Sequence, residues 1–190
     1  MRLPCKNKED EGRRSFILVQ LPELTSAKSE AYKDGYKKIS DITKERISRV
    51  ENASFKTFRL DETNIRVWDT DFEKLESALQ LASKSIKEDR TSEDILYEIL
   101  LKYGIELTTR VEDITVGGKK IFVVGTGALI VCLDDDITEQ VIEGIAKLKE
   151  KLNPESTQVV FKDQGFADCI VKTNAIQILK QYGINDVKSI

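Results

Sequence analysis

The sequence predicts an α/β fold, with a strand-helix unit within residues 1–69 followed by a small α/β (α+β) domain in residues 70–190. Two observations support this prediction. Short apolar runs rich in β-branched residues, which are typical of buried strands, alternate with amphipathic stretches of helical period. Glycines and short polar residues separate these stretches at positions where hairpin turns and helix caps are expected. At 190 residues, the chain has room for one domain, or for one domain and part of another.

The N-terminal third predicts two strands and one helix. Phe16–Val19 is a continuous apolar run that ends before Pro22, and it predicts a short buried strand. After a polar loop over 24–33, isoleucines at helical spacing predict a helix over 34–50. The alternating segment 55–60 predicts a half-buried strand.

The following residues predict two helices and then antiparallel strands. Apolar residues at helical spacing indicate a helix over 71–87 and a second one over 92–103. The second helix follows Thr91, which forms a capping-box pattern with Asp94. Segment 107–133 reads as antiparallel strands, because Gly117-Gly118 is a strong two-residue hairpin signal.

The C-terminal third predicts alternating helices and strands. Asp136 is expected to cap a helix that reaches about Leu152. A strand over 158–162 and a helix over 167–182 follow, and residues 187–190 are expected to form an edge strand.

Composition limits the chemistry that the chain can perform. The sequence has no histidine and three widely spaced cysteines, which excludes a Cys/His zinc site and any Ser-His or Cys-His pair. Cys132 and Cys169 lie in apolar stretches and are expected to be small core residues. The net charge of −3 does not favour a chain that forms a main DNA groove alone. No apolar run is long enough for a membrane span and no signal peptide is evident, so a cytoplasmic location is expected.

Two short motifs resemble a metal site and a phosphate loop, but the neighbouring residues do not favour either interpretation. Asp134-Asp135-Asp136 could form a magnesium site for a nuclease, but it lies between a strand and a helix, where a capping turn is expected. We therefore predict no metal site. Gly125-Thr126-Gly127 could form a phosphate loop, but a strand follows it where a phosphate loop would need a helix, which favours a hairpin turn.

The predicted helix over 34–50 is notably basic. Its cations are Lys37, Lys38, Lys44, Arg46 and Arg49. They could contact DNA phosphates. Acidic residues lie among them, however, so an ion-paired, solvated helix face is the favoured interpretation.

Several ordered blocks resemble one family. The segment 14–23, RSFILVQLPE, resembles the R-x-F-I-x-V-Q-L-P-E segment of type III restriction-modification DNA methyltransferases. The similarity continues in blocks at 28–36, 42–47, 55–61, 96–104, 127–134 and 160–163. On this resemblance, the chain is the C-terminal part of an adenine-specific modification subunit. Residues 1–69 are then the edge of a Rossmann-like methyltransferase domain, and residues 70–190 a C-terminal domain.

The resemblance implies a cofactor and a substrate for the intact enzyme. Members of this family transfer a methyl group from S-adenosylmethionine to an adenine amino nitrogen of DNA, using a D-P-P-Y type loop and an F-x-G-x-G type loop. Neither motif occurs in this sequence, so no catalytic residue is identified and the chain alone is expected to be inactive and to bind no cofactor. By strand alignment, Gln20 stands where related enzymes commonly carry an acid that meets the cofactor ribose, and Glu23 lies three residues on. These two are the candidate cofactor-binding residues.

The resemblance also implies partners. Residues 70–190 are expected to pair two modification subunits into a homodimer and to dock a restriction subunit, with DNA bound through the intact complex. The alternative is a stand-alone dimerisation or interaction module of a restriction-modification complex.

Overall fold

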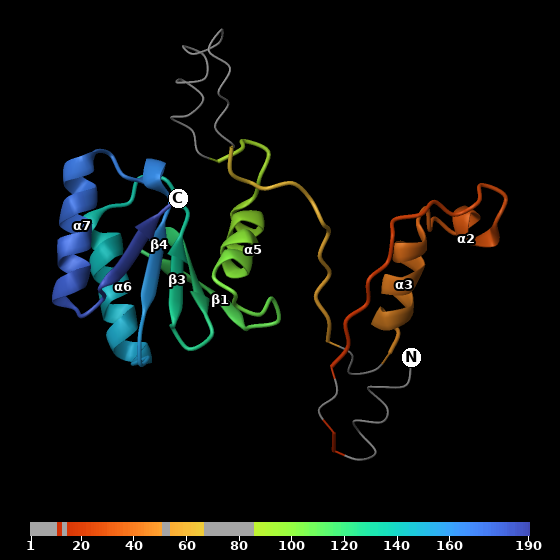
Figure 1. Cartoon of the computed structure of the whole chain (residues 1–190), viewed down its shortest axis with the longest axis horizontal. Helices are drawn as coiled ribbons and strands as arrows, with labels where there is room; N and C mark the ends of the chain where they lie inside the picture. The colour runs from red at the N-terminus through yellow and green to blue at the C-terminus, as the bar shows by residue number, and fades with distance from the viewer. Residues whose placement is uncertain (1–10, 13–14, 51–53, 67–85) are drawn as a thin grey trace, which may run out of the picture. The chain divides into compact units, whose positions relative to one another are not determined.

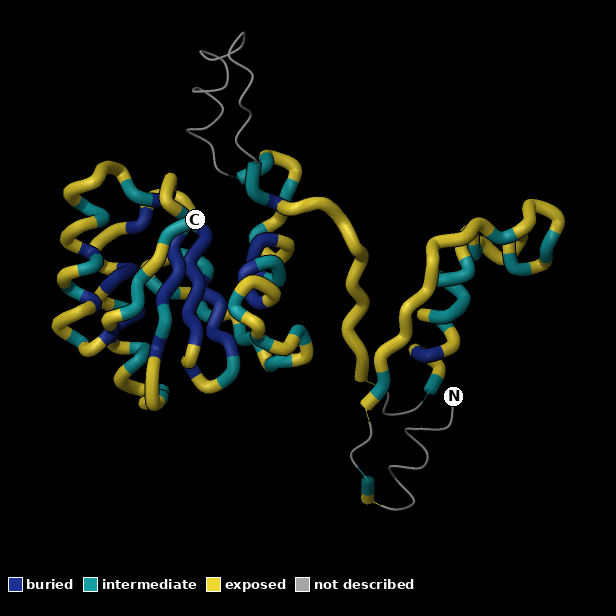
Figure 2. Tube along the Cα trace, viewed as in Figure 1, coloured by how far each residue is buried: buried dark blue, intermediate teal, exposed yellow. Residues whose placement is uncertain are grey.

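A computed structural model describes residues 11–12, 15–50, 54–66 and 86–190. The chain forms two compact units, Met1–Arg59 and Leu60–Ile190, which we call the N-terminal and C-terminal units. Figure 2 shows where buried residues concentrate: the inner strands of the sheet in the C-terminal unit are largely buried, whereas the described residues of the N-terminal unit are mostly exposed. Among the described residues, no helix is both long and apolar enough to cross a bilayer.

A five-stranded mixed sheet forms the centre of the C-terminal unit, in the order β1-β2-β3-β4-β5. Its strands are β1 (Val111–Val116), β2 (Lys119–Val124), β3 (Leu129–Cys132), β4 (Gln158–Phe161) and β5 (Asp186–Ser189). β1, β2 and β3 pair in antiparallel fashion, whereas β3, β4 and β5 run parallel. The predicted α/β class and the predicted hairpins are therefore confirmed for this unit.

Helices cover both faces of the sheet (Figure 1). α5 (Ser92–Lys102) packs on one face, and α6 (Glu139–Leu152) and α7 (Cys169–Gln181) pack on the other. The strand period of two divides each strand between these layers. In β3, for example, Ile130 and Cys132 join the α6–α7 core, whereas Leu129 and Val131 join the α5 core. Each parallel pair is connected through a helix, as parallel strands require.

Turn and cap residues place most of these elements as predicted. Gly117 and Gly118 have φ angles of 57° and 80°, which the two-residue turn between β1 and β2 needs. Thr91 and Asp94 form the expected capping box, in which the Thr91 hydroxyl accepts from the Asp94 N–H at 3.2 Å. The prediction that Asp136 caps α6 is wrong, because Thr138 is the N-cap and Asp136 turns the chain with a φ of 55° two residues earlier.

The N-terminal unit differs more from the prediction. Its described helices are α2 (Glu30–Lys33), which lies within the predicted loop, and α3 (Ile39–Ser48). The predicted helix over 34–50 is shortened at its start because Gly35 adopts a φ of 94° and ends the first turn. The strands predicted at 16–19 and 55–60 are wrong: both segments are extended, but neither is a strand.

The predicted strand at 16–19 is not merely unpaired but exposed. Ile17 and Val19 are each 91% exposed, and Leu18 is 54% exposed. A short apolar run becomes a buried strand only where neighbouring strands and a covering layer are present. Of the strand and the helix expected in residues 1–69, the structure therefore shows the helix, α3, but not the strand.

Two further predictions are limited by the described ranges. The helix predicted over 71–87 lies outside the described residues except at its end, where Ile86 forms an antiparallel bridge with Ile65. The predicted boundary between residues 69 and 70 also lies outside them.

Candidate functional site

The segment 15–24 carries the two candidate cofactor residues. Gln20 and Glu23 are both exposed, and their side chains are not brought together by any hydrogen bond within the described residues. The Gln20 amide donates only to the neighbouring Leu21 carbonyl, at 3.3 Å. Large apolar side chains surround Gln20 along the segment, and Leu21 and Leu24 are 67% and 76% exposed. The segment therefore offers a mostly apolar stretch with two exposed polar side chains.

Backbone hydrogen bonds fix the end of this segment beside α3. The Glu23 carbonyl accepts from the Ile39 N–H at 3.0 Å, and Leu24 forms an antiparallel bridge with Lys38. Thr25 donates its N–H to the Lys37 carbonyl at 3.0 Å. Glu23 is therefore held at the first turn of α3, even though its side chain is free in solvent.

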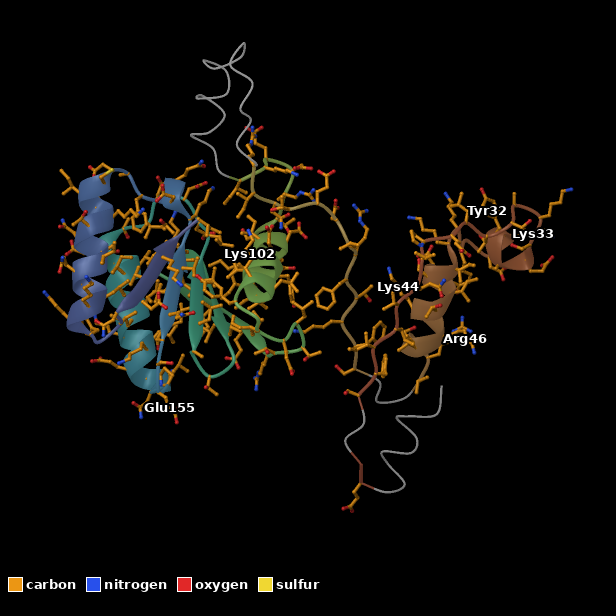
Figure 3. All side chains as sticks on the ribbon, in the orientation of Figure 1. Tyr32, Lys33, Lys44, Arg46, Lys102 and Glu155 are labelled. Carbon is orange, nitrogen blue, oxygen red and sulfur yellow. The ribbon has the colours of Figure 1, made fainter. Side chains whose placement is uncertain are left out.

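The cations of α3 are less paired than the sequence indicates. Arg49 forms an ion pair with Glu45 at 2.8 Å, and this pairing raises the pKa of Arg49. Lys44 and Arg46 are exposed and form no ion pair with any described residue. Figure 3 shows both side chains reaching out from α3. The predicted ion-paired face is confirmed at Arg49 only.

A half-buried carboxylate, Glu98, ties the start of the C-terminal unit to α5. Glu98 is only 15% exposed, and it accepts from the Thr63 hydroxyl at 2.5 Å and from the backbone and side-chain N–H groups of Asn64, both at 2.7 Å. Burial acts to raise the pKa of Glu98, but these hydrogen bonds and Lys102 at 3.0 Å outweigh it and lower the pKa to about 2. Because every group here is a structural partner on the same chain, we assign the cluster to stability.

The three consecutive aspartates at the end of β3 are occupied by structural contacts. Asp134 accepts from the Lys120 N–H at 2.7 Å, and Asp135 pairs with Lys162 at 2.7 Å. Asp136 supplies the left-handed turn before α6. Within the part of the chain that the structure describes, no three Asp, Glu, Cys or His side chains converge as a metal site would require.

The glycine loop is a hairpin turn, as expected. Gly125 and Gly127 have φ angles of 65° and 99° between β2 and β3. A Cβ on Gly127 would lie 3.0 Å from the Leu152 side chain, so this glycine also allows close packing of the turn against α6. No helix begins at this loop, and the phosphate-loop reading lacks its structural context.

A shallow pocket of about 410 Å³ lies between the start of α6 and α7. Apolar side chains such as Ile142, Val171 and Ile178 form most of its wall. The prediction that Cys169 lies in the core is wrong: it begins α7 directly after the N-cap Asp168, in an exposed stretch, and is itself exposed. Cys132 is buried as predicted, and burial raises its pKa to about 11.

Comparison with known proteins finds two related Mod subunits. Over 123 residues, which are 60% of this chain, it is 35% identical to the type III restriction-modification enzyme EcoP15I Mod subunit of Escherichia coli. Over 125 residues, it is 32% identical to the EcoPI Mod subunit of Escherichia phage P1. These matches cover 18% and 19% of the two relatives, so the chain spans about a fifth of the length of the curated relatives that it matches. No protein-family model matches the chain.

The exposed segment 15–24 and the exposed cations Lys44 and Arg46 of α3 are thus the candidate functional features of the N-terminal unit. Identities of 32% and 35% over more than half of the chain are too extended for chance similarity. The chain is related to the Mod subunits of type III restriction-modification enzymes.

Proposed function

We propose that the chain is part of a type III modification methyltransferase that acts on an adenine amino group of DNA, and that it performs no methyl transfer alone. The observation that carries the proposal is its similarity to two Mod subunits over about a fifth of their length. The sequence has neither a D-P-P-Y nor an F-x-G-x-G motif, which supports catalysis by residues outside it. S-adenosylmethionine is the cofactor that the family resemblance implies for the intact enzyme.

In this proposal, the segment 16–19 becomes a strand of the methyltransferase sheet when the rest of that sheet is present. Its exposed Ile17, Leu18 and Val19 would then be buried, and that burial would stabilise each side chain by roughly 1.5–3 kcal/mol. Gln20 and Glu23 would lie at the end of this strand, where a side chain can reach the hydroxyls of a cofactor ribose.

A chimera tests the proposal. The whole of this chain replaces the corresponding segment of the EcoP15I Mod subunit, and transfer of a labelled methyl group from S-adenosylmethionine to DNA is measured beside the unmodified subunit. We expect the chimera to methylate DNA and this chain alone to give no turnover. A chimera that folds but is inactive, or turnover by the chain alone, would contradict the proposal.

The same chimera tests the candidate cofactor residues. We expect Gln20→Ala and Glu23→Ala to raise the KM for S-adenosylmethionine by about tenfold each, as the loss of one ribose hydrogen bond does. Lys28→Ala, an exposed side chain in the same unit, serves as the control. An unchanged KM in both variants would remove these residues from the cofactor site.

A second candidate function is a dimerisation or docking module in the C-terminal unit, with a second Mod-type subunit or a restriction subunit as the partner. It is favoured by the open edges of the sheet at β1 and β5, since edge strands can pair with another chain. Sedimentation of the chain at micromolar concentration tests it. A strictly monomeric species would count against self-association.

A further inference from the structure

Charge is strongly segregated between the two units. Residues 1–59 contain 14 Lys and Arg against 9 Asp and Glu, a net charge of +5, whereas the other 131 residues contain 16 against 24, a net charge of −8. The overall net charge of −3 hides this asymmetry. A basic unit of this kind favours a polyanionic partner, because bound cations release the counterions condensed on it.

The free cations of the basic unit gather on α3 and the turn before it. Lys37, Lys38, Lys44 and Arg46 are all exposed. Three of the neighbouring acids have partners of their own: Glu45 pairs with Arg49 at 2.8 Å, Glu30 pairs with Lys33 at 2.8 Å, and Asp41 accepts from the Lys38 N–H at 3.2 Å. A fourth acid, Asp34, is exposed and forms no ion pair with a described residue. None of the four cations forms an ion pair with a described residue, so their charges remain available to a partner.

The helix spreads two of these charges to different sides. Lys44 and Arg46 are two positions apart, which is a rotation of about 200° on an α-helix. Figure 3 shows them leaving α3 in different directions. A helix with one cation on each flank matches a groove of duplex DNA, where phosphates of both strands line the two sides.

We infer that α3 is a DNA-contacting helix, in which Lys44 and Arg46 bind backbone phosphates on either side of one groove and Lys37 and Lys38 add a further contact at its start. This inference rests on the proposed function, since DNA is the substrate of a methyltransferase of that class. The contacts are to phosphates and carry no sequence preference of their own. They hold the duplex while residues elsewhere in the intact enzyme read the sequence.

Binding of a labelled DNA duplex to the full chain tests the inference by fluorescence anisotropy at several salt concentrations. We expect the double variant Lys44→Gln/Arg46→Gln to weaken binding about tenfold at low salt and to reduce the salt slope by about 2, one unit for each phosphate contact. The matched control is Lys151→Gln/Lys180→Gln, which removes two exposed charges from the acidic C-terminal unit. We expect it to bind as the unaltered chain does.

Three results would overturn the inference. The first is that the unaltered chain does not bind DNA, and the second is that the two double variants lose equal DNA affinity. The third is that vesicles containing phosphatidylserine bind as tightly as DNA and are equally sensitive to Lys44→Gln/Arg46→Gln, which would assign the surface to a membrane. The chimera distinguishes these failures from failure of the proposed function. If the chimera methylates DNA while the α3 variant has no effect, the proposed function stands and the helix is not its DNA contact. If the chimera is inactive while the α3 variant loses DNA binding, the surface stands without the enzyme.

Discussion

The two units contain apolar runs of similar composition, but these runs form strands only in the C-terminal unit. Leu129–Cys132 is buried on both faces as β3, between β2 and β4 and beneath helices on each side. Phe16–Val19 is equally apolar and equally β-branched, but its Ile17 and Val19 are each 91% exposed. The difference lies in the neighbours: a strand needs hydrogen-bonding partners along its edges and a layer to bury its side chains, and neither requirement is visible in the run itself.

The largest expected effect is obtained by placing a charge in each of these two runs. Val131→Asp puts a carboxylate at a position that is 0% exposed, and we expect it to destabilise the C-terminal unit by about 4 kcal/mol or more. Val19→Asp changes a side chain that is 91% exposed, and we expect less than about 0.5 kcal/mol. Urea denaturation followed by circular dichroism measures both. A large effect of Val19→Asp would show that the segment 15–19 is already buried in solution.

The same reasoning explains which elements could be predicted from the sequence. The hairpin at Gly117-Gly118 and the Thr91–Asp94 capping box are local, because the residues that specify them lie within four positions of each other. The strand at 16–19 depends on distant partners, and its prediction failed. The prediction for Asp136 was wrong for a different reason: Asp136 adopts a φ of 55°, which turns the chain, and the helix begins two residues later after Thr138.

The features of the candidate site also divide into those specified by nearby residues and those that depend on distant partners. The cations on and around α3 could be predicted from residue types, but their ion pairing could not, because pairing depends on which acids are used by caps and turns. Asp41 bonds the Lys38 N–H and Glu45 bonds Arg49, which leaves Lys44 and Arg46 free. The Glu98 cluster was missed altogether, since Asn64 and Glu98 are 34 residues apart and only folding brings them together.

Close packing of the C-terminal unit can be tested at a single glycine. A Cβ on Gly144 of α6 would lie 2.1 Å from a methyl group of Val116 on β1. We therefore expect Gly144→Ala to destabilise the unit by about 1–3 kcal/mol, although alanine favours helices. Adding Val116→Ala should recover part of this loss relative to Val116→Ala alone, and a double-mutant cycle by urea denaturation measures the coupling. Additive effects would mean that α6 does not approach β1 this closely.

Glu98 tests how strongly the first residues of the C-terminal unit are held. Its pKa falls from 4.5 to about 2 on folding, so its contribution to stability is present above pH 4.5 and is lost as the pH falls towards 2. We expect Glu98→Gln to cost about 2 kcal/mol at neutral pH and progressively less below pH 4.5. Urea denaturation at a series of pH values measures the difference. A constant difference across this pH range would show that the Glu98 carboxylate gains nothing from its ionisation.

The smallest effect on the free energy of unfolding is expected at ion pairs on exposed helix faces, which both units contain. Glu45 pairs with Arg49 on α3 at 2.8 Å, and Glu143 pairs with Lys147 on α6 at 3.6 Å, and in both cases the partners are four positions apart along the helix. Such pairs contribute about 0.3–0.5 kcal/mol, since water screens the charges and the side chains lose freedom. We expect Glu45→Gln and Glu143→Gln each to change the free energy of unfolding by less than about 0.5 kcal/mol.

The two substitutions should nevertheless differ in DNA binding. Glu45→Gln frees Arg49 beside Lys44 and Arg46 and should tighten DNA binding about twofold or more. Glu143→Gln should leave DNA binding unchanged. Equal DNA affinity of the two variants would show that the charge of α3 does not contribute to DNA binding.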